Sequence, residues 1–544
     1  MSSPSEQSKT KAEELKIEGN ALQRKGDYRG AHTKYSEAIK FNSENAILFA
    51  NRAAASLSMK EFLDAAYDAQ KATTLDRKFS KAWARLAKAS HELCLYSKSI
   101  EAWKEALSCL PASNLSPVEL KLKAQYEDGW RQVESAKSKI ENQSPEDAGL
   151  AQLAIIPENM PWSRASSMEQ DLVRNKTFST SAWVIMAAYK EFSEGVQTMK
   201  RIRMVEPNRL EGTLGALADI TNGLLRDDRV FHMDVNNWNE LLHRQVQFEC
   251  GVTNAWTTGG ASIIQEEAPK RLKAGGWSAV RPALSNTVRT WVLQALFSSK
   301  GNVSHEHALS LYKSAISILE WGAKTWKYAR TADRGVIFEK TFIRGVKRLR
   351  MEAYLAACKK CGLNSKSYTL RKLMDMAADI LADVDGNPPC IQEDGLSYDA
   401  GSVLSFWYYP KASALAAMGF CQFELASQSK DDPEVAYAFW EESGDYYMQA
   451  AQCFPQDDEQ FPYFLKVALE TQWHRGLPLK KALETCAGIR EGVTQAKKIW
   501  EHGAFWDIVE GNLARVQRFE LEALTGLMDG RYTMDTPSSS IAFV

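Results

Sequence analysis

Five side chains near the N-terminus have the types and spacings needed to bind carboxylates. Lys81 and Arg85 lie four residues apart, as do Lys16 and Asn20, so each pair would share one face of a helix. Asn51 lies 34 residues before Arg85. The set offers three positive charges and two amide donors, which suits two closely spaced carboxylates, as at a peptide ending in Asp. For a single Lys/Arg pair, the competing interpretation is a solvated helix face.

The elements that would carry these residues follow a 34-residue repeat between about Ser8 and Pro111. Small and aromatic residues recur at this spacing in four series: Gly19, Ala53, Ala87; Ala31, Ala65, Ser99; Tyr35, Ala69, Trp103; and Ala38, Ala72, Ala106. Small residues let paired helices approach closely, so we expect three helix pairs. Residues 116–141 indicate one further helix, because Ser116 and Glu119 match a capping box, and it would cover the open end of the stack.

These stretches resemble tetratricopeptide repeats (TPR), and in particular the dicarboxylate-clamp TPR domains of co-chaperones such as the Hsp-organising protein and the small glutamine-rich TPR proteins. The sequences that carry the resemblance are LKIEGN (15–20), LFANRAAA (48–55) and SKAWARLAKA (80–89). It covers residues 8–141, about a quarter of the chain.

The resemblance implies a superhelix whose first helices line a concave groove. The family's clamp is a Lys and an Asn on the first helix, an Asn on the third, and a Lys and an Arg on the fifth; these match Lys16, Asn20, Asn51, Lys81 and Arg85. The implied partner is the Glu-Glu-Val-Asp terminus of seventy- and ninety-kilodalton heat-shock chaperones. Residues 8–111 contain 18 Lys/Arg against 13 Asp/Glu, a surplus that favours an acidic tail. We expect roughly micromolar affinity that weakens with salt.

The remaining three quarters of the chain show helical spacing without a clean repeat. The polar stretch ENQSPEDAGL predicts a linker over 142–155, and the polar C-terminus predicts a disordered tail over 531–544. Between them, 156–530 is expected to form one all-helical domain, divergent and TPR-like or solenoid-like, so the fold class is all-α. Helices are predicted in the stretches 181–203, 304–329, 339–361, 367–384, 409–428, 433–454 and 477–505.

Composition argues against several partners and compartments. Charged residues make up 25% of the chain and cancel to a net charge of −1, so no nucleic-acid partner is expected. The N-terminus lacks the apolar core of a signal peptide, and no run approaches the roughly 18–20 apolar residues of a membrane span, so no membrane insertion is expected. Nine scattered cysteines fit reduced thiols. We therefore expect a protein of the cytoplasm, with the nucleus as a second location.

Residues that could do catalysis or hold a metal do not form a complete set. Cys358 and Cys361 form a CxxC without a second pair, and His305 and His307 would point apart on a helix. The calcium-like loop that begins at Asp383 has Pro where the sharp turn needs Gly. Phosphate-loop, dinucleotide and hydrolase motifs are missing. We expect no catalytic residues, no metal, no cofactor and no enzyme activity.

The favoured function is that of an adaptor or co-chaperone. The clamp would bind the C-terminal tail of a chaperone, and the C-terminal region would bind an unknown client. One alternative is a scaffold that grips another protein's acidic terminus. The other is an uncharacterised enzyme domain within the C-terminal region. A deep pocket with converging ionisable side chains would favour the enzyme, whereas a groove without them would favour the adaptor.

Overall fold

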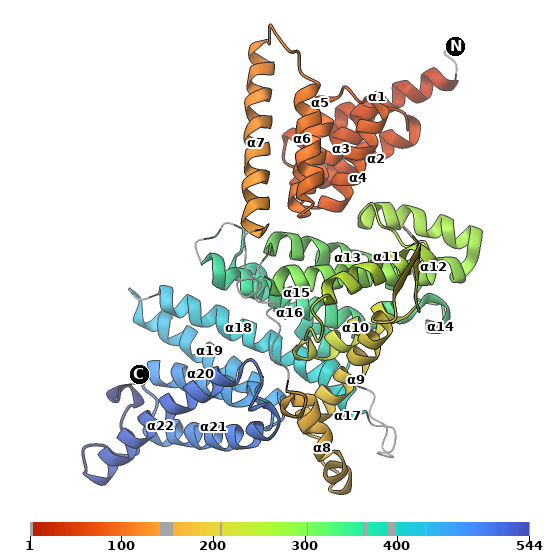
Figure 1. Ribbon diagram of the computed structural model, residues 1–544. Helices are drawn as coiled ribbons and strands as arrows, with labels where there is room; N and C mark the ends of the chain where they lie inside the picture. Colours follow the sequence, from red (N-terminus) through yellow and green to blue (C-terminus); the bar gives the residue numbers. More distant parts are fainter. Residues whose placement is uncertain are drawn as a thin grey trace. The chain divides into compact units, whose positions relative to one another are not determined.

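The computed structural model describes residues 4–141, 156–206, 209–301, 303–362, 365, 367–389, 399–429 and 431–542; the predicted linker 142–155 lies outside them. The described chain is all-α apart from the short hairpin of β1 (Arg203–Glu206) and β2 (Arg209–Glu211) (Figure 1). Contacts divide the chain into unit 1, residues 1–151 with 249–338, and unit 2, residues 152–248 with 339–544. The expected single domain over 156–530 differs from this division.

Unit 1 begins with three helix pairs and one longer helix. They are α1 (Pro4–Arg24), α2 (Tyr28–Phe41), α3 (Ala46–Ser58), α4 (Phe62–Leu75), α5 (Ser80–Glu92), α6 (Tyr96–Ser108) and α7 (Pro117–Glu141). The repeated small residues lie where paired helices meet: a Cβ on Gly19 would come within 2.6 Å of the Tyr35 ring, and Ala53 and Ala87 are fully buried. The 34-residue spacing therefore reflects three repetitions of one packing contact.

The capping box at the start of α7 is confirmed. The Ser116 N–H donates to Glu119 Oε2 over 2.8 Å, and the Glu119 N–H donates to Ser116 Oγ over 3.3 Å. Further along, α7 packs on α6: the rings of Tyr126 and Trp103 have centroids 5.6 Å apart, and an added Cβ on Gly129 would clash with Trp103. The helix thus buries apolar surface of the last repeat.

Residues 249–338 complete unit 1 with a long helical hairpin. Helices α12 (Ala261–Lys300) and α13 (His305–Thr325) pack along each other and are followed by α14 (Thr331–Arg334) and the 3-10 turn η3 (Val336–Phe338). Gly276, with φ 65° and ψ −170°, interrupts α12. The flanking residues 273–282, which include the paired glycines Gly275 and Gly276, are helical on either side of this kink.

One buried carboxylate of the repeats caps the hairpin. Asp64 on α4 accepts hydrogen bonds from the backbone N–H of Gly260 (3.2 Å) and from the Ser262 hydroxyl (2.6 Å), at the N-terminus of α12. Its side chain thereby satisfies donors that a helix start leaves open. A second contact lies at α13, where Lys313 Nζ donates to Glu61 Oε1 over 3.1 Å. The hairpin therefore packs on the repeats themselves.

We expect Asp64 to make the stability of unit 1 depend on pH. Burial raises the pKa of Asp64 from 3.8 to about 6, so the folded protein holds a proton between those values that the unfolded chain has lost. Its stabilising contribution is present below about pH 4 and is lost as the pH rises through 6. Relative to Asp64→Asn, the wild-type free energy of unfolding should fall by up to about 3 kcal/mol between pH 4 and 7.

Urea unfolding of both proteins across this pH range checks the expectation. His32 and His307, whose pKa values burial lowers to about 4, act in the opposite direction, but they are common to both proteins and cancel in the difference. Parallel pH curves for wild type and variant would contradict the account.

Unit 2 is a series of helices, most of which pack on the next helix along the chain. They are α8 (Pro161–Arg174), α9 (Ser181–Met199), α10 (Ala216–Arg226), α15 (Lys340–Cys361), α16 (Leu370–Gly386), α17 (Ala400–Val403), α18 (Tyr409–Gln428), α19 (Pro433–Cys453), α20 (Gln460–His474), α21 (Leu479–Trp500) and α22 (Trp506–Met528). The boundary between the units falls inside α11 (Trp238–Thr253). The order α18, α19, α20, α21, α22 along one stack gives the solenoid-like, helical-hairpin architecture (Figure 1).

The C-terminal tail differs from the disordered segment that the sequence predicted. Instead of being disordered from 531, the described residues up to 542 fold back on α20 and α21. The Ser538 N–H donates to the Leu477 carbonyl over 2.8 Å, and the Trp473 indole N–H donates to the Ile541 carbonyl over 2.7 Å. Ile541 is 2% exposed. A single apolar anchor and backbone hydrogen bonds hold a segment whose composition is otherwise polar.

Unit 2 contains a buried ionic cluster. The Arg229 guanidinium bonds Asp227, Asp458 and Glu459, and it lies over the Trp500 ring at 3.8 Å. The Tyr409 hydroxyl donates to Asp458 Oδ2 over 2.5 Å. All three carboxylates are buried. The cluster ties the turn after α10 to the residues before α20 and to the end of α21.

Candidate functional site

The first helices of the three repeats carry the five predicted residues. Helix α1 packs on α3, α3 on α5, and α5 on α7, so these helices form one continuous wall. A buried bidentate pair fixes α3 beside the site: Arg52 Nε and Nη2 each donate to Asp68 over 2.8 Å, and Arg52 Nη1 donates to Ser36. Arg52 directly follows Asn51 in the chain, so this pair limits how far Asn51 can move.

Asn20 and Asn51 are brought together by the fold. Asn51 Nδ2 donates to Asn20 Oδ1 over 3.1 Å, and the Tyr35 hydroxyl donates to the same oxygen over 2.8 Å. Because Oδ1 receives both donors, the amide nitrogen of Asn20 is left to bind an external acceptor. The two amides form one pre-arranged group that joins the first and second repeats.

Arg85 lies near this group and has no acidic partner among the described residues. Its charge is felt at Tyr35 and at Tyr126 of α7, so the guanidinium lies in the neighbourhood of both phenols. Burial lowers the pKa of Arg85, and its Nη1 atom is shielded from solvent without a hydrogen-bond partner in the part of the chain described. A buried donor left unsatisfied costs about 1–3 kcal/mol, more if charged. A bound anion would satisfy it.

Each of the two lysines lies one helical turn before a site residue on the same helix. Lys16 precedes Asn20 by one turn of α1, and its Nζ lies 2.7 Å from Glu13 Oε1 on the same helix. Lys81 precedes Arg85 by one turn of α5 and is exposed to solvent. Neither lysine contacts the asparagine group directly. The structure thus joins Asn20 and Asn51 by a hydrogen bond and puts Arg85 within electrostatic reach of Tyr35, which bonds Asn20.

Sequence reasoning missed Tyr35 as a member of the site. Its place in the 34-residue series suggested helix packing, because the equivalent residues are Ala69 and Trp103. Its ring does pack on Gly19, but its hydroxyl also orients Asn20. The sequence did contain a signal. Of the three equivalent residues, only Tyr35 carries a hydroxyl group, and it lies in the same repeat as Asn20.

We expect Tyr35→Phe to weaken binding of an Asp-terminated peptide by about twofold to tenfold, because a hydrogen bond of this kind contributes about 0.5–1.5 kcal/mol. The ring and its packing remain, so the melting temperature should change little. Fluorescence anisotropy with a labelled peptide measures the effect, and Tyr28→Phe, at an exposed tyrosine of the same helix, is the matched control. Equal loss in both variants would rule out the positioning role.

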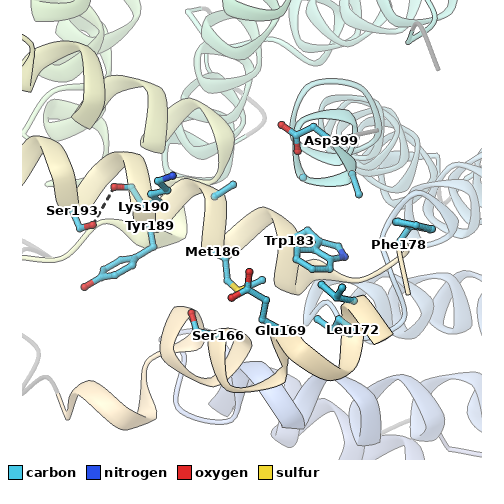
Figure 2. A pocket seen from close by; sticks show the side chains of 14 residues that line it. Ser166, Glu169, Leu172, Phe178, Trp183, Met186, Tyr189, Lys190, Ser193 and Asp399 are labelled. Carbon is cyan, nitrogen blue, oxygen red and sulfur yellow. Dashed lines mark hydrogen bonds between the residues drawn. The ribbon is translucent and has the colours of Figure 1, made fainter. Parts of the chain in front are cut away.

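Unit 2 contains a separate apolar cavity of about 750 Å³ between α8, α9 and the start of α17 (Figure 2). Leu172, Trp183 and Met186 line it, and the exposed residues Val173 and Phe178 extend it to the surface. Such a volume is within the range of ligand pockets in proteins. Its lining is mostly apolar, so it suits an apolar side chain or short segment.

The ionisable residues around this cavity do not converge. Asp399 accepts from the Ser402 N–H over 2.9 Å as the cap of α17, whereas Glu169 and Lys190 come from α8 and α9 (Figure 2). Within the described residues these three groups make no contact with one another, and no cluster of His, Cys, Asp or Glu that could hold a metal is found there. In the same described part, none of the helices combines the length and apolarity needed to cross a membrane. The cavity lacks the paired groups that acid–base chemistry requires.

Comparison with known proteins finds relatives of the repeat region. Over 142 residues the chain is 35% identical to Small glutamine-rich tetratricopeptide repeat-containing protein 2 of Saccharomyces cerevisiae, spanning 26% of this chain and 40% of that protein. It is 36% identical over 96 residues to the heat-shock protein cognate co-chaperone sgt12 of Aspergillus fumigatus, spanning 18% of this chain and 28% of that protein. No protein-family model matches the chain.

Among solved structures, the Sgt2 TPR domain from Aspergillus fumigatus is 31% identical; the match covers 23% of this chain and 82% of that domain, with a TM-score of 0.21. The chain spans less than half the length of the two relatives above. Over about a quarter of its length, the chain therefore resembles tetratricopeptide-repeat co-chaperones, among them the small glutamine-rich tetratricopeptide repeat-containing proteins.

Proposed function

We propose that the protein is a co-chaperone adaptor whose repeats bind the acidic, aspartate-terminated tail of a heat-shock chaperone through Lys16, Asn20, Asn51, Lys81 and Arg85. The observation that carries the proposal is the guanidinium of Arg85. It is partly desolvated, has no acidic partner among the described residues, and acts electrostatically on Tyr35, whose hydroxyl bonds the amide group of Asn20 and Asn51. A protein that keeps an unpaired cation in such a place gives up stability, which a bound carboxylate restores.

In the proposed binding mode, two groups of residues bind two different parts of the peptide. Lys16 and the amides of Asn20 and Asn51 hold the terminal carboxylate, and Lys81 and Arg85 hold the acidic side chain and nearby backbone. Arg85 can bind a carboxylate with two parallel hydrogen bonds, whereas the lysines act as point charges. The local surplus of positive charge supports an acidic ligand. Related co-chaperones point to heat-shock chaperones of the cytosol as its source, and hence to the cytosol as the place of action.

A capture experiment tests this proposal. Immobilised full-length protein is incubated with purified seventy- or ninety-kilodalton chaperone, either intact or lacking its last four residues. We expect retention of at least one intact chaperone and no retention of its truncated form. Equal capture of intact and truncated chaperones would place the contact elsewhere. Capture of neither, by protein that is folded, would leave the scaffold for another acidic terminus as the better account.

The cavity in unit 2 supports the second half of the adaptor proposal, the binding of a client. It is apolar, open at Val173 and Phe178, and its ionisable residues do not meet. These properties favour recognition of an apolar client segment over catalysis by an enzyme domain. Phe178→Asp is the variant that should abolish client capture while leaving the chaperone-tail interaction unchanged.

A further inference from the structure

A second cationic surface lies in unit 1, away from the five clamp residues, and combines positive charge with aromatic rings. It is formed by residues 270–281, around the kink of α12, and 321–334, at the end of α13 and in α14 (Figure 1). These two segments contain eight Lys/Arg and one acidic residue, Asp333, in a chain whose net charge is −1. Including the acids that immediately precede them, Glu266, Glu267 and Glu320, still leaves a surplus of four positive charges.

Three tryptophans join the two segments. The rings of Trp277 and Trp326 pack edge to face with centroids 5.2 Å apart, and Trp321 packs edge to face on Trp326 at 4.8 Å. All three are only partly buried, and the neighbouring Tyr328 is 89% exposed. Tryptophan and tyrosine rings left at a surface beside cations are unusual for a face that meets only water.

The cations of this surface differ in how they are used. Arg271 lies over the Trp256 ring at 3.7 Å, Arg281 donates to the Ala332 carbonyl, and Arg330 pairs with Asp333. The arginines thus have partners within the fold. The four lysines Lys270, Lys273, Lys324 and Lys327 are exposed to solvent, and Lys327 also lies over the ring of the exposed Tyr328.

We propose that this aromatic and lysine-rich surface docks the protein on a membrane leaflet that contains anionic phospholipids, without insertion of a helix. Lysines are point charges that suit a diffuse negative surface, and each one close to such a leaflet strengthens binding roughly fivefold. Tryptophan and tyrosine favour the boundary between headgroups and acyl chains. Together they give the charge and the shallow apolar contact that reversible membrane binding needs.

A nucleic acid is the main competing partner, and the geometry disfavours it. Bases bind by stacking on open ring faces, usually along a groove that follows the backbone. Here the tryptophans pack edge to face on one another, and Lys327 lies over the ring of Tyr328 at 4.6 Å. The arginines that would hold phosphates bidentately are engaged within the fold.

Co-sedimentation of the full-length protein with vesicles tests the proposal. Vesicles of phosphatidylcholine alone are compared with vesicles that contain about 30 mol% phosphatidylserine, at about 0.1 M and 0.5 M salt. We expect binding to the anionic vesicles that weakens at the higher salt. Lys324→Glu with Lys327→Glu should reduce it by at least about 25-fold. Tyr328→Ser should reduce it by about threefold to tenfold at unchanged salt dependence.

The matched control is Lys480→Glu with Lys481→Glu, which makes the same change of net charge at two exposed lysines of unit 2. Peptide binding measured on the same samples shows that the repeats are folded and keeps this proposal separate from the clamp. If the control variant lost vesicle binding equally, the overall charge of the protein would explain the result, and the proposal would be overturned. Lysine-dependent binding of a single-stranded RNA or a poly-glutamate peptide by protein that ignores anionic vesicles would also overturn it.

Discussion

Replacing Arg85 with methionine is expected to weaken binding of an Asp-terminated peptide by at least about 150-fold while leaving the protein as stable or more stable. Hydrogen bonds to a charged carboxylate contribute about 1.5–3 kcal/mol, and Arg85 can make two. In the unbound protein its Nη1 atom has no partner among the described residues, so its removal relieves a cost. Methionine keeps most of the aliphatic stem and its packing.

The opposite signs of the two effects make this variant informative. A residue kept only for structure would lose stability when changed, whereas a ligand-binding residue loses affinity. Fluorescence anisotropy gives the dissociation constant, and thermal unfolding gives the stability. Arg77→Met, at an exposed arginine just before α5, is the control for loss of one positive charge. A fall in stability of several degrees without a change in affinity would assign Arg85 to the fold.

Asp458→Ala is expected to destabilise unit 2 by about 3–5 kcal/mol. The substitution removes two hydrogen bonds from Arg229, at 3.0 Å and 2.9 Å, and one from Tyr409. The buried guanidinium of Arg229 then has one acidic partner fewer. Removing one partner of a buried ion pair costs about 3–5 kcal/mol.

The change in the midpoint of urea unfolding measures this effect. Asp445→Ala, at an exposed position of α19, is the matched control and should change stability by less than about 0.5 kcal/mol. Because unit 1 has its own core, we expect the clamp to retain its affinity for peptide in Asp458→Ala under native conditions. A midpoint for Asp458→Ala equal to that of the control would mean that the cluster contributes little.

The repeats could be predicted from the sequence because each of them repeats the same helix–helix contact. Gly19, Ala53 and Ala87 occupy equivalent packing positions in the three repeats. Because the same contact occurs three times, small residues recur at a fixed spacing that can be seen in the sequence. The capping box of α7 was equally readable, since it depends on residues three apart. The long helices of unit 2 followed from their apolar spacing, to within a few residues at most ends.

Contacts between distant segments could not be predicted. Asp64 has the appearance of a solvated acid on α4, and only the fold brings Gly260 and Ser262, almost 200 residues later, to its carboxylate. The same is true of Tyr35, whose hydroxyl acts on Asn20 across a helix pair. Ile541 is the buried apolar side chain of the packed C-terminus, and a single such residue leaves no periodic signal. Periodicity in a sequence reveals only contacts that are repeated. Each of these contacts occurs once, so no periodic pattern could predict it.

The contact through Asp64 also decides which protein should be used in binding measurements. A fragment that ends near residue 145 would expose this buried acid and remove the hairpin of α12 and α13 that it caps. A loss of affinity in such a fragment could then come from the repeats losing support. The full-length chain avoids this ambiguity.

Titration of the full-length protein with a fluorescent peptide ending in Glu-Glu-Val-Asp, as the free acid and as the C-terminal amide, tests the central claim most directly. The account predicts roughly micromolar binding of the free acid that weakens as salt is raised, and at least tenfold weaker binding of the amide, because the terminal carboxylate is one of the two groups that the cations and amides hold. Equal affinity for both peptides, or no binding of the free acid at low salt by folded protein, would contradict the clamp.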